Sequence, residues 1–559
     1  MKEKISKYRP YPPVDLPDRK WPSRRIEKAP TWCSVDLRDG NQALQNPMNL
    51  EEKTEMFEML VKMGFKEIEI GFPSASEVEY EFLRKLIEEG LIPDDVTVQV
   101  LTQARERLIE KTFEALKGAK SAIVHLYNST STLQREVVFH TDREGVVRIA
   151  LEGVAIVKEL AGRTNETEIK FEYSPESFTG TEMDFALDIS NRVMAAWGPT
   201  PENRAILNLP ATVEMSTPNI FADQIEWFDR NLDNRESVVI SVHNHNDRGT
   251  AVAATELAVM AGAERIEGTL FGNGERTGNV DIVVLGLNLF SQGVDPELDF
   301  RDINRLIDVY RRCSKMPVHQ RHPYAGELVY TAFSGSHQDA IGKGMNAYKS
   351  ARSRVWGIPY LPIDPTDVGR TYEAIVRINS QSGKGGAAYV MDSEFGYELP
   401  KKMQPEFGAL VQRATERAGA EISSEELWQC FEDNYLNLTG PFLFRSASFR
   451  TTPTDEEETV VSQLEATVAR NGEPKRIAGE GNGPIDAFCN ALKEYFDLDF
   501  QFLGYNEHAL EISSSAKAAA YIQIRYEGKT EVFGVGVDTN ISIASFKALI
   551  GAINRAIGM

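Results

Sequence analysis

Two histidines stand two residues apart at the end of an apolar run, in the segment VVISVHNHNDRG (238–249). Because successive side chains of a strand point to opposite faces, His243 and His245 are expected to leave the strand on the same side. Two imidazoles placed in this way can share one divalent ion, since imidazole suits Zn, Fe, Ni or Mn. The motif is short, and taken alone it is equally well explained as a polar loop with local hydrogen bonds.

The histidines close the seventh of eight short β-like runs, which alternate with amphipathic helical stretches. The runs are 33–37, 67–71, 96–101, 122–126, 168–173, 205–209, 238–243 and 265–270. Helix signals lie between them: Asn49 and Glu52 have the spacing of a capping box, and Gly64 marks a helix end. Eight βα units in about 270 residues predict an α/β fold of the TIM (β/α)8 barrel type. The alternative, a doubly wound open sheet, usually has a Gly-rich first turn, which DLRDGNQ is not.

Polar side chains follow most of these runs at the end where TIM barrels carry their catalytic groups. They are Arg38, Asp39, His125, Glu176, Thr212, His243, His245 and, in the loop GNGERTGN, Asn279. Asp39 would complete a two-histidine, one-carboxylate ligand set with open positions, and Asn279 offers a further neutral oxygen. Nitrogen and oxygen ligands without thiolate leave Zn²⁺, Mn²⁺ and Mg²⁺ all open. Arg38 could stabilise a negative substrate oxygen, and the alternative is an ion pair with Asp39 or Glu176. Glu176 could orient or relay a proton, and the alternative is that it is simply solvated.

Composition narrows the class of protein. A chain of 559 residues predicts two or three domains, and a net charge of −22 argues against nucleic acid or an anionic membrane as a partner. No stretch of about 18 apolar residues is present, and the N-terminus lacks the apolar core of a secretory signal. The four cysteines form no CxxC pair, which is typical of reduced thiols. We therefore expect a cytoplasmic protein.

The remaining sequence predicts an extended arm over residues 1–30, a barrel over 31–305, a linking subdomain over 306–435 and a small α+β domain over 436–559. The last domain contains a weak repeat, with tight turns at Asn471-Gly472 and Glu527-Gly528 about 55 residues apart. Each copy predicts a ββα unit, and a polar linker, TTPTDEEET, precedes the first. We reject nucleotide binding at SGKGG, GEGNGP and GVGVDTN, because the first lacks the Walker spacing and the others follow hairpins rather than a parallel strand.

Seven motifs in order resemble the longer form of the 2-isopropylmalate synthase family, whose enzymes add acetyl-CoA to 3-methyl-2-oxobutanoate (2-oxoisovalerate). The motifs are LRDGNQA, HLYNSTS, HNHNDRGTAVA, FGNGERTGN, FSGSHQDAI, PYLPIDPTDVGRTYEA and NSQSGKGG, and the similarity spans essentially the whole chain. The first and third motifs are shared with homocitrate synthase, citramalate synthase and hydroxymethylglutaryl-CoA lyase. These enzymes are the alternatives within the same class.

The resemblance implies one divalent metal ion held by Asp39, His243 and His245, with Asn279 nearby. It implies that Thr212 holds the keto-acid carboxylate. It also implies a homodimer in which the linking subdomain of one protomer covers the barrel mouth of the other. In that arrangement His337, which matches a base, and Tyr360, which matches an assisting tyrosine, reach into the partner's barrel. The C-terminal domain is implied to bind leucine as a feedback inhibitor.

The chemistry of the residues agrees with this resemblance. A Claisen-type addition needs an electrophilic ketone, which a metal can provide, and a base of near-neutral pKa, which a histidine can provide. His125 and the loop after it are expected to line the keto-acid pocket with Arg38. Two other classes fit the sequence less well: a barrel hydrolase usually carries its H-x-H after the first strand, and a non-catalytic amino-acid sensor would not need metal ligands at strand ends.

Overall fold

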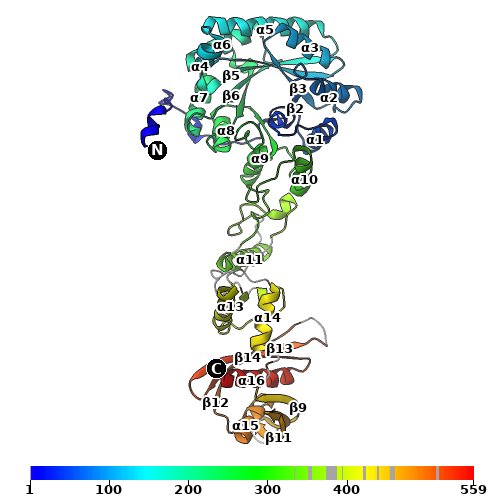
Figure 1. The fold of residues 1–559 in the computed structure, drawn as a ribbon, viewed down its shortest axis with the longest axis vertical. Coiled ribbons are helices and arrows are strands. Elements are labelled where there is room, and N and C mark those ends of the chain that lie inside the picture. Colours follow the sequence, from blue (N-terminus) through cyan, green and yellow to red (C-terminus); the bar gives the residue numbers. More distant parts are fainter. Residues whose placement is uncertain are drawn as a thin grey trace. The chain divides into compact units, whose positions relative to one another are not determined.

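The computed structural model describes residues 2–558 except 333, 351–354, 373–386, 389, 393, 419–423, 437, 439, 454–459 and 511–514. The chain divides into two compact units, residues 1–330 with 363–371 and residues 331–362 with 372–559, and each is described by itself (Figure 1). The motif NSQSGKGG and most of the polar linker TTPTDEEET lie outside the described residues. The domain boundaries predicted at residues 30, 305 and 435 stay predictions.

The first unit contains a closed parallel barrel in which the eight strands follow one another in chain order, so the predicted TIM barrel is confirmed. Its strands are β1 (Thr31–Ser34), β2 (Glu67–Gly71), β3 (Thr97–Gln103), β4 (Ser121–Ser129), β5 (Glu168–Glu176), β6 (Ala205–Ala211), β7 (Val238–Asn244) and β8 (Arg265–Gly268). Its helices are α1 (Leu50–Met63), α2 (Glu77–Glu88), α3 (Glu106–Leu116), α4 (Thr132–Gln134), α5 (Arg143–Arg163), α6 (Met183–Trp197), α7 (Pro218–Asn231), α8 (Ala251–Ala261), α9 (Ile282–Ser291) and α10 (Ile303–Ser314). Figure 1 shows the helices around the strands.

Local signals account for the helix limits. The Asn49 side chain accepts from the Glu52 N–H while the Glu52 carboxylate accepts from the Asn49 N–H, which is the predicted capping box of α1. Gly64 ends this helix with φ at 108°, a backbone conformation that side chains with a Cβ rarely adopt.

Most strand ends differ from the sequence prediction by a few residues, and two of these differences bear on the site. The first strand ends at Ser34, and a short π-helical turn, η3 (Asp36–Gly40), follows it. The buried Asp36 carboxylate causes this change of direction, because it accepts from the Leu270 N–H at 3.0 Å. Burial raises the pKa of Asp36 to about 7. The fourth strand runs on to Ser129, so His125 lies within the barrel rather than at the strand's end.

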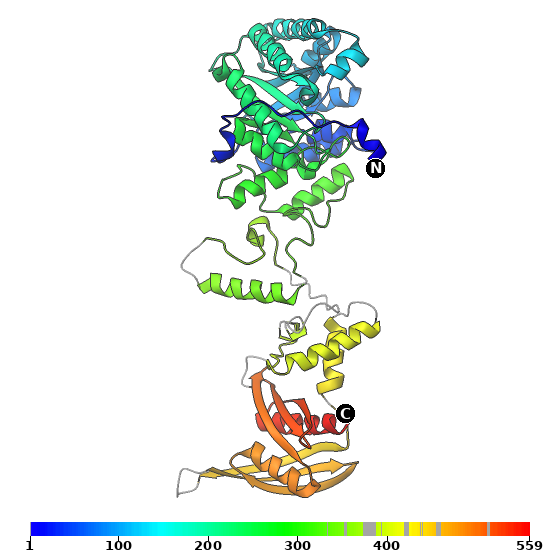
Figure 2. The same ribbon diagram turned by 90° about the vertical axis from the view of Figure 1, so that its left-hand side faces the viewer.

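The N-terminal arm runs along the outside of the barrel (Figure 2), where buried carboxylates of α7 hold it. Asp223 accepts from Arg19 Nε at 2.8 Å and from Trp21 Nε1 at 2.7 Å. The Glu226 carboxylate accepts from the backbone N–H groups of Lys20 and Trp21. Charge-assisted hydrogen bonds of this kind hold the chain that enters β1.

The second unit contains the predicted repeat, and a further strand precedes each hairpin. Its elements are α11 (Gly335–Ser350), α13 (Gln404–Ala418), α14 (Ser424–Tyr435), β9 (Phe442–Pro453), β10 (Val460–Arg470), β11 (Glu473–Gly481), α15 (Pro484–Phe496), β12 (Phe500–Ala509), β13 (Ala518–Tyr526), β14 (Thr530–Asp538) and α16 (Ile541–Gly558). The strands form two antiparallel sheets, β11-β10-β9 and β12-β13-β14. The turn between β10 and β11 has positive φ at both Asn471 and Gly472.

The glycines of GVGVDTN have a packing role in this unit. A Cβ on Gly534 would lie 2.1 Å from the Ala548 carbonyl oxygen, and one on Gly536 would lie 2.1 Å from the Ala544 carbonyl oxygen. These glycines let α16 lie directly on β14. By length and composition α16 is also apolar enough to cross a membrane, but 67% of it is buried in the unit, as in the core helix of a globular domain.

Candidate active site

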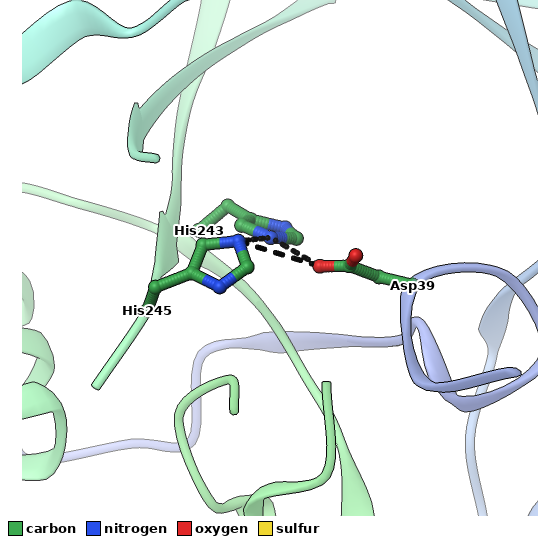
Figure 3. A group of neighbouring side chains, drawn as sticks. All are labelled: Asp39, His243 and His245. Atoms are coloured by element: carbon green, nitrogen blue, oxygen red, sulfur yellow. Dashed lines mark hydrogen bonds and ion pairs between the residues drawn. The ribbon is translucent and has the colours of Figure 1, made fainter. Parts of the chain in front are cut away.

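Asp39, His243 and His245 meet at one end of the barrel, although Asp39 is 204 residues from His243 (Figure 3). Asp39 Oδ2 lies 3.1 Å from His243 Nε2 and 3.4 Å from His245 Nε2. The two Nε2 atoms lie 3.3 Å apart. The π-helical turn η3 supplies the carboxylate, and the end of β7 supplies both imidazoles on one face, as the spacing predicts.

These donors fit a divalent metal ion. The ligand atoms of the three buried residues all lie within 4.8 Å of one another, and they offer two imidazole nitrogens and a carboxylate oxygen. Asn279 pairs with His245 in an isolated β-bridge, and the buried Asn279 Oδ1 has no hydrogen-bond partner in the part of the chain that the structure describes. A buried oxygen without a partner is costly unless something else is bound to it.

Neighbouring charges and burial set the pKa values of the three side chains. Burial by itself raises the pKa of Asp39, but Arg38 and the two histidines outweigh burial and hold that pKa below its ordinary value. Burial likewise lowers the pKa of His243, yet its hydrogen bonds to Asp39 and Glu267 raise it to about 9. Burial and the neighbouring His243 lower the pKa of His245 to about 4. At neutral pH the Asp39 carboxylate is therefore charged and the His245 ring is neutral, and both forms can bind a metal ion.

Arg38 lies beside the ligands, with its guanidinium 3.4 Å from Asp39 Oδ1 and 3.2 Å from Glu69 Oε2. The predicted ion pair of Arg38 with Asp39 is therefore present, and a second pair, with Glu69, was not predicted. Arg38 Nε is buried and has no hydrogen-bond partner among the described residues. Its N–H remains available to a bound oxygen.

His125 is buried, and both of its ring nitrogens have partners. Nε2 lies 2.7 Å from Ser174 Oγ, and Nδ1 lies 3.4 Å from Glu69 Oε1 and 3.3 Å from Gln99 Nε2. The ring is thus fixed in orientation by three neighbouring strands.

A cavity of about 240 Å³ opens over these groups at the C-terminal ends of the strands. Its lining includes all of the predicted barrel residues except Asn279: Arg38, Asp39, His125, Glu176, Thr212, His243 and His245. Glu176 accepts a short hydrogen bond from Ser129, and Thr212 Oγ1 accepts from the Ser177 N–H at 2.9 Å. No acceptor for the Thr212 hydroxyl proton is found among the residues that the structure describes, so this proton can be donated into the cavity.

His337 and Tyr360 belong to the second unit. Their rings stack with centroids 4.0 Å apart and an angle of 26° between the planes. His337 is exposed, and Tyr360 is 61% exposed with a positive φ of 65°. The pair is presented at a surface of its own unit rather than packed in its core.

Family models match most of the chain. One described as "HMGL-like" matches residues 29–309, half of the chain, and two others match 327–392 ("Alpha-isopropylmalate synthase, post-catalytic domain-like") and 421–557 ("LeuA allosteric (dimerisation) domain"). The chain is 56% identical over 553 residues to a 2-isopropylmalate synthase of Clostridium acetobutylicum, covering 99% of each protein. The chain belongs to the 2-isopropylmalate synthase family. It is also 54% identical to the synthase of Rhodospirillum rubrum over 98% of each protein.

Among solved structures, a hydroxymethylglutaryl-CoA lyase from Pseudomonas aeruginosa aligns with a TM-score of 0.42 and 18% identity, over 51% of this chain and 92% of that one. Of the site residues predicted from the sequence, the structure brings seven together around the cavity and Asn279 beside them. His337 and Tyr360 lie within the segment that the post-catalytic model matches.

Sequence reasoning missed a layer of charged and amide side chains inside the barrel below the cavity. Its fully buried members are Glu69, Gln99, Glu172, Asn208, Arg265 and Glu267. The centre of a TIM barrel is usually filled by branched apolar residues, so a polar layer needs a reason. The available signal was a glutamate inside short apolar runs, as in EIEIG and RIEG, at positions that alternate with apolar ones.

Proposed function

We propose that the chain catalyses the metal-dependent condensation of acetyl-CoA, 3-methyl-2-oxobutanoate and water to (2S)-2-isopropylmalate and CoA, the first committed step of leucine synthesis. The observation that carries this proposal is the meeting of Asp39, His243 and His245 at the wall of a cavity that also holds a cation and a hydroxyl donor. The similarity to 2-isopropylmalate synthases over 99% of the chain supports the choice of substrates.

The proposed ion is Mg²⁺, Mn²⁺ or Zn²⁺, held by Asp39, His243 and His245 with Asn279 as a further oxygen ligand. When bound, such an ion supplies a Lewis acid that polarises the ketone and stabilises the developing alkoxide. Asp39 reaches it from η3, so the position of that turn sets the carboxylate's position.

Around the keto acid, we assign three roles to residues of the cavity. The free N–H of Arg38 Nε is to donate to the oxygen that becomes the alkoxide, where a fixed cation stabilises charge best. The Thr212 hydroxyl is to donate to the carboxylate of the keto acid. His125, fixed by its three partners, is to form the wall beside the substrate side chain.

For the proton transfers we propose His337 as the base that takes a proton from the methyl group of acetyl-CoA, with Tyr360 assisting. The resulting carbanion forms the new C–C bond with the ketone carbon. Water then cleaves the thioester and CoA leaves, with Glu176 orienting or relaying a proton. His337 stacks on Tyr360 and both rings are exposed, which supports the proposal that they act at the surface of another protomer.

We propose a homodimer, in which His337 of one protomer serves the partner's barrel. An apolar surface beyond β4 supports contact at the barrel mouth: Leu133, Val137, Val138 and Phe139 are 41–69% exposed there. The match of residues 421–557 to an allosteric dimerisation domain supports leucine binding by the second unit. We place the enzyme in the cytoplasm.

The decisive experiment follows thiol release on mixing the purified protein with acetyl-CoA and each keto acid of a panel. CoA release with 3-methyl-2-oxobutanoate, abolished by chelator and restored by Mg²⁺, Mn²⁺ or Zn²⁺, is the expected result. A preference for pyruvate or 2-oxoglutarate would instead indicate citramalate or homocitrate synthase. No release with any keto acid would refute the synthase and favour a lyase or an amino-acid sensor.

Two histidine variants test the assignment of the base. His337→Ala is expected to depress turnover far more than keto-acid binding, because only the deprotonation step is lost. His319→Ala, which replaces an exposed histidine outside the cavity, is the matched control. Equal turnover in the two variants would remove His337 from the mechanism.

A further inference from the structure

We propose that Glu267 is a positioning residue that orients His243, so that with the ion bound the imidazole keeps its proton on Nδ1 and presents Nε2 to the ion. The inference rests on the proposed metal site, and it assigns a role to a buried carboxylate inside the barrel. A histidine binds a metal ion through a ring nitrogen that carries no hydrogen. The hydrogen-bond partner of the other ring nitrogen decides which nitrogen that is.

The contact between the two side chains is direct. His243 Nδ1 lies 2.9 Å from Glu267 Oε2, while its other nitrogen, Nε2, lies 3.1 Å from Asp39 Oδ2. His243 and Glu267 are register partners on the neighbouring strands β7 and β8, so their side chains project into the barrel at the same level. Because an ionised carboxylate can only accept, the proton of this hydrogen bond belongs to the histidine.

Glu267 is itself held rigidly by donors from three other positions. Oε1 accepts from Gln99 Nε2 at 2.8 Å and from Arg265 Nη1 at 3.0 Å. Oε2 accepts from Asn208 Nδ2 at 3.2 Å as well as from His243. With no exposed surface and four donors around it, the carboxylate has one orientation, and it transmits that orientation to the ring.

The neighbouring ligand has no such support. His245 Nδ1 is buried and has no hydrogen-bond partner in the described parts of the chain. The barrel therefore fixes one imidazole, His243, through Glu267, and leaves the other to be fixed by what it binds. This asymmetry predicts that a change at Glu267 acts on ion binding rather than on substrate contacts.

Glu267→Gln tests the inference with almost no change of volume. A glutamine amide can donate to Nδ1, which would move the ring proton to Nε2 and block the ligand atom. We would titrate the metal-free full-length protein with Mn²⁺ and read free Mn²⁺ by electron paramagnetic resonance. The dissociation constant is expected to rise by about 10- to 100-fold, the usual effect of losing such a partner.

Glu226→Gln is the matched control, since Glu226 is an equally buried carboxylate whose contacts are with Lys20, Trp21 and Arg230 outside the barrel rather than with His243. Its Mn²⁺ affinity is expected to stay within about threefold of the wild type. An equal loss of affinity in both variants, or none in Glu267→Gln, would overturn the inference. If Glu267→Gln does not fold, Glu267→Asp takes its place in the same Mn²⁺ titration. The aspartate keeps the charge that Arg265 needs, but its shorter side chain does not reach His243 Nδ1.

Nitrogen-15 spectra of the histidine rings in the Zn²⁺-loaded protein give a second readout, because they report which ring nitrogen of His243 carries the proton. Nδ1–H is expected in the wild type, and Nε2–H there would contradict the inference. Both measurements omit acetyl-CoA and keto acid. Absence of CoA release would therefore count against the proposed reaction alone, and unchanged Mn²⁺ affinity would count against Glu267 alone.

Discussion

Arg38→Lys separates the charge of this residue from its geometry. The guanidinium reaches Glu69 and Asp39 at once, at 3.2 and 3.4 Å, and its Nε hydrogen has no partner among the described residues. A lysine ammonium is a single point charge that can neutralise the buried Glu69 but cannot span both carboxylates and also reach a substrate oxygen. Arg38→Ala would be less informative, because a buried carboxylate left unpaired costs about 3–5 kcal/mol of stability.

The expected magnitude follows from the loss of one fixed donor. Removing such a donor from a developing oxyanion costs about 2.7–4 kcal/mol, which corresponds to about a 100- to 1000-fold lower kcat. Mn²⁺ affinity and the unfolding temperature are expected to change little, since the charge beside Asp39 and Glu69 remains. Arg301→Lys, at an arginine that is 85% exposed, is the matched control and is expected to leave kcat unchanged.

The assay is steady-state thiol release at saturating acetyl-CoA, keto acid and metal ion, combined with a thermal unfolding curve for each variant. A kcat for Arg38→Lys within about threefold of the wild type would refute the assignment of Arg38 to the alkoxide. A large fall in kcat accompanied by an equal fall in Mn²⁺ occupancy would show instead that Arg38 acts by holding Asp39.

Three further predictions concern single side chains. Thr212→Val is expected to raise the KM for the keto acid by about 10-fold or more at nearly constant kcat, because a hydrogen bond to a charged group is worth about 1.5–3 kcal/mol; an unchanged KM would contradict its role. Asp223→Asn is expected to free the N-terminal arm, seen as faster amide hydrogen exchange at residues 19–21, and unchanged exchange would show that other contacts suffice. Burial raises the pKa of Glu182, but hydrogen bonds from Arg135 outweigh it and lower the pKa to about 2. Its stabilisation is therefore complete above about pH 4.5 and lost as the pH falls toward 2, worth about 1 kcal/mol after screening at a side chain 36% exposed. Acid unfolding curves of Glu182→Gln that lose as much stability over this range as the wild type would contradict it.

The barrel could be predicted because its signals are local. Each strand is a short apolar run, and each helix limit depends on neighbouring residues, as at Asn49 and Gly64. The pairing of His243 with His245 is local in the same sense, since it follows from the alternation of side chains along one strand.

Features that depend on distant partners could not be predicted. The early end of β1 depends on the contact of Asp36 with Leu270, 234 residues away. The position of His125 inside the barrel depends on hydrogen-bond partners from other strands, Glu69 and Ser174. Glu267 had a sequence signal as a charged residue in an apolar run, but its contact with His243 needs the register of β7 and β8.

The most direct test of the central claim is an anomalous difference map at the zinc edge from crystals of the protein grown with Zn²⁺. Our account predicts one peak that lies about 2.0–2.2 Å from Asp39 Oδ2, His243 Nε2 and His245 Nε2 together. A peak bound elsewhere, or a saturated protein with no density between these three atoms, would contradict it.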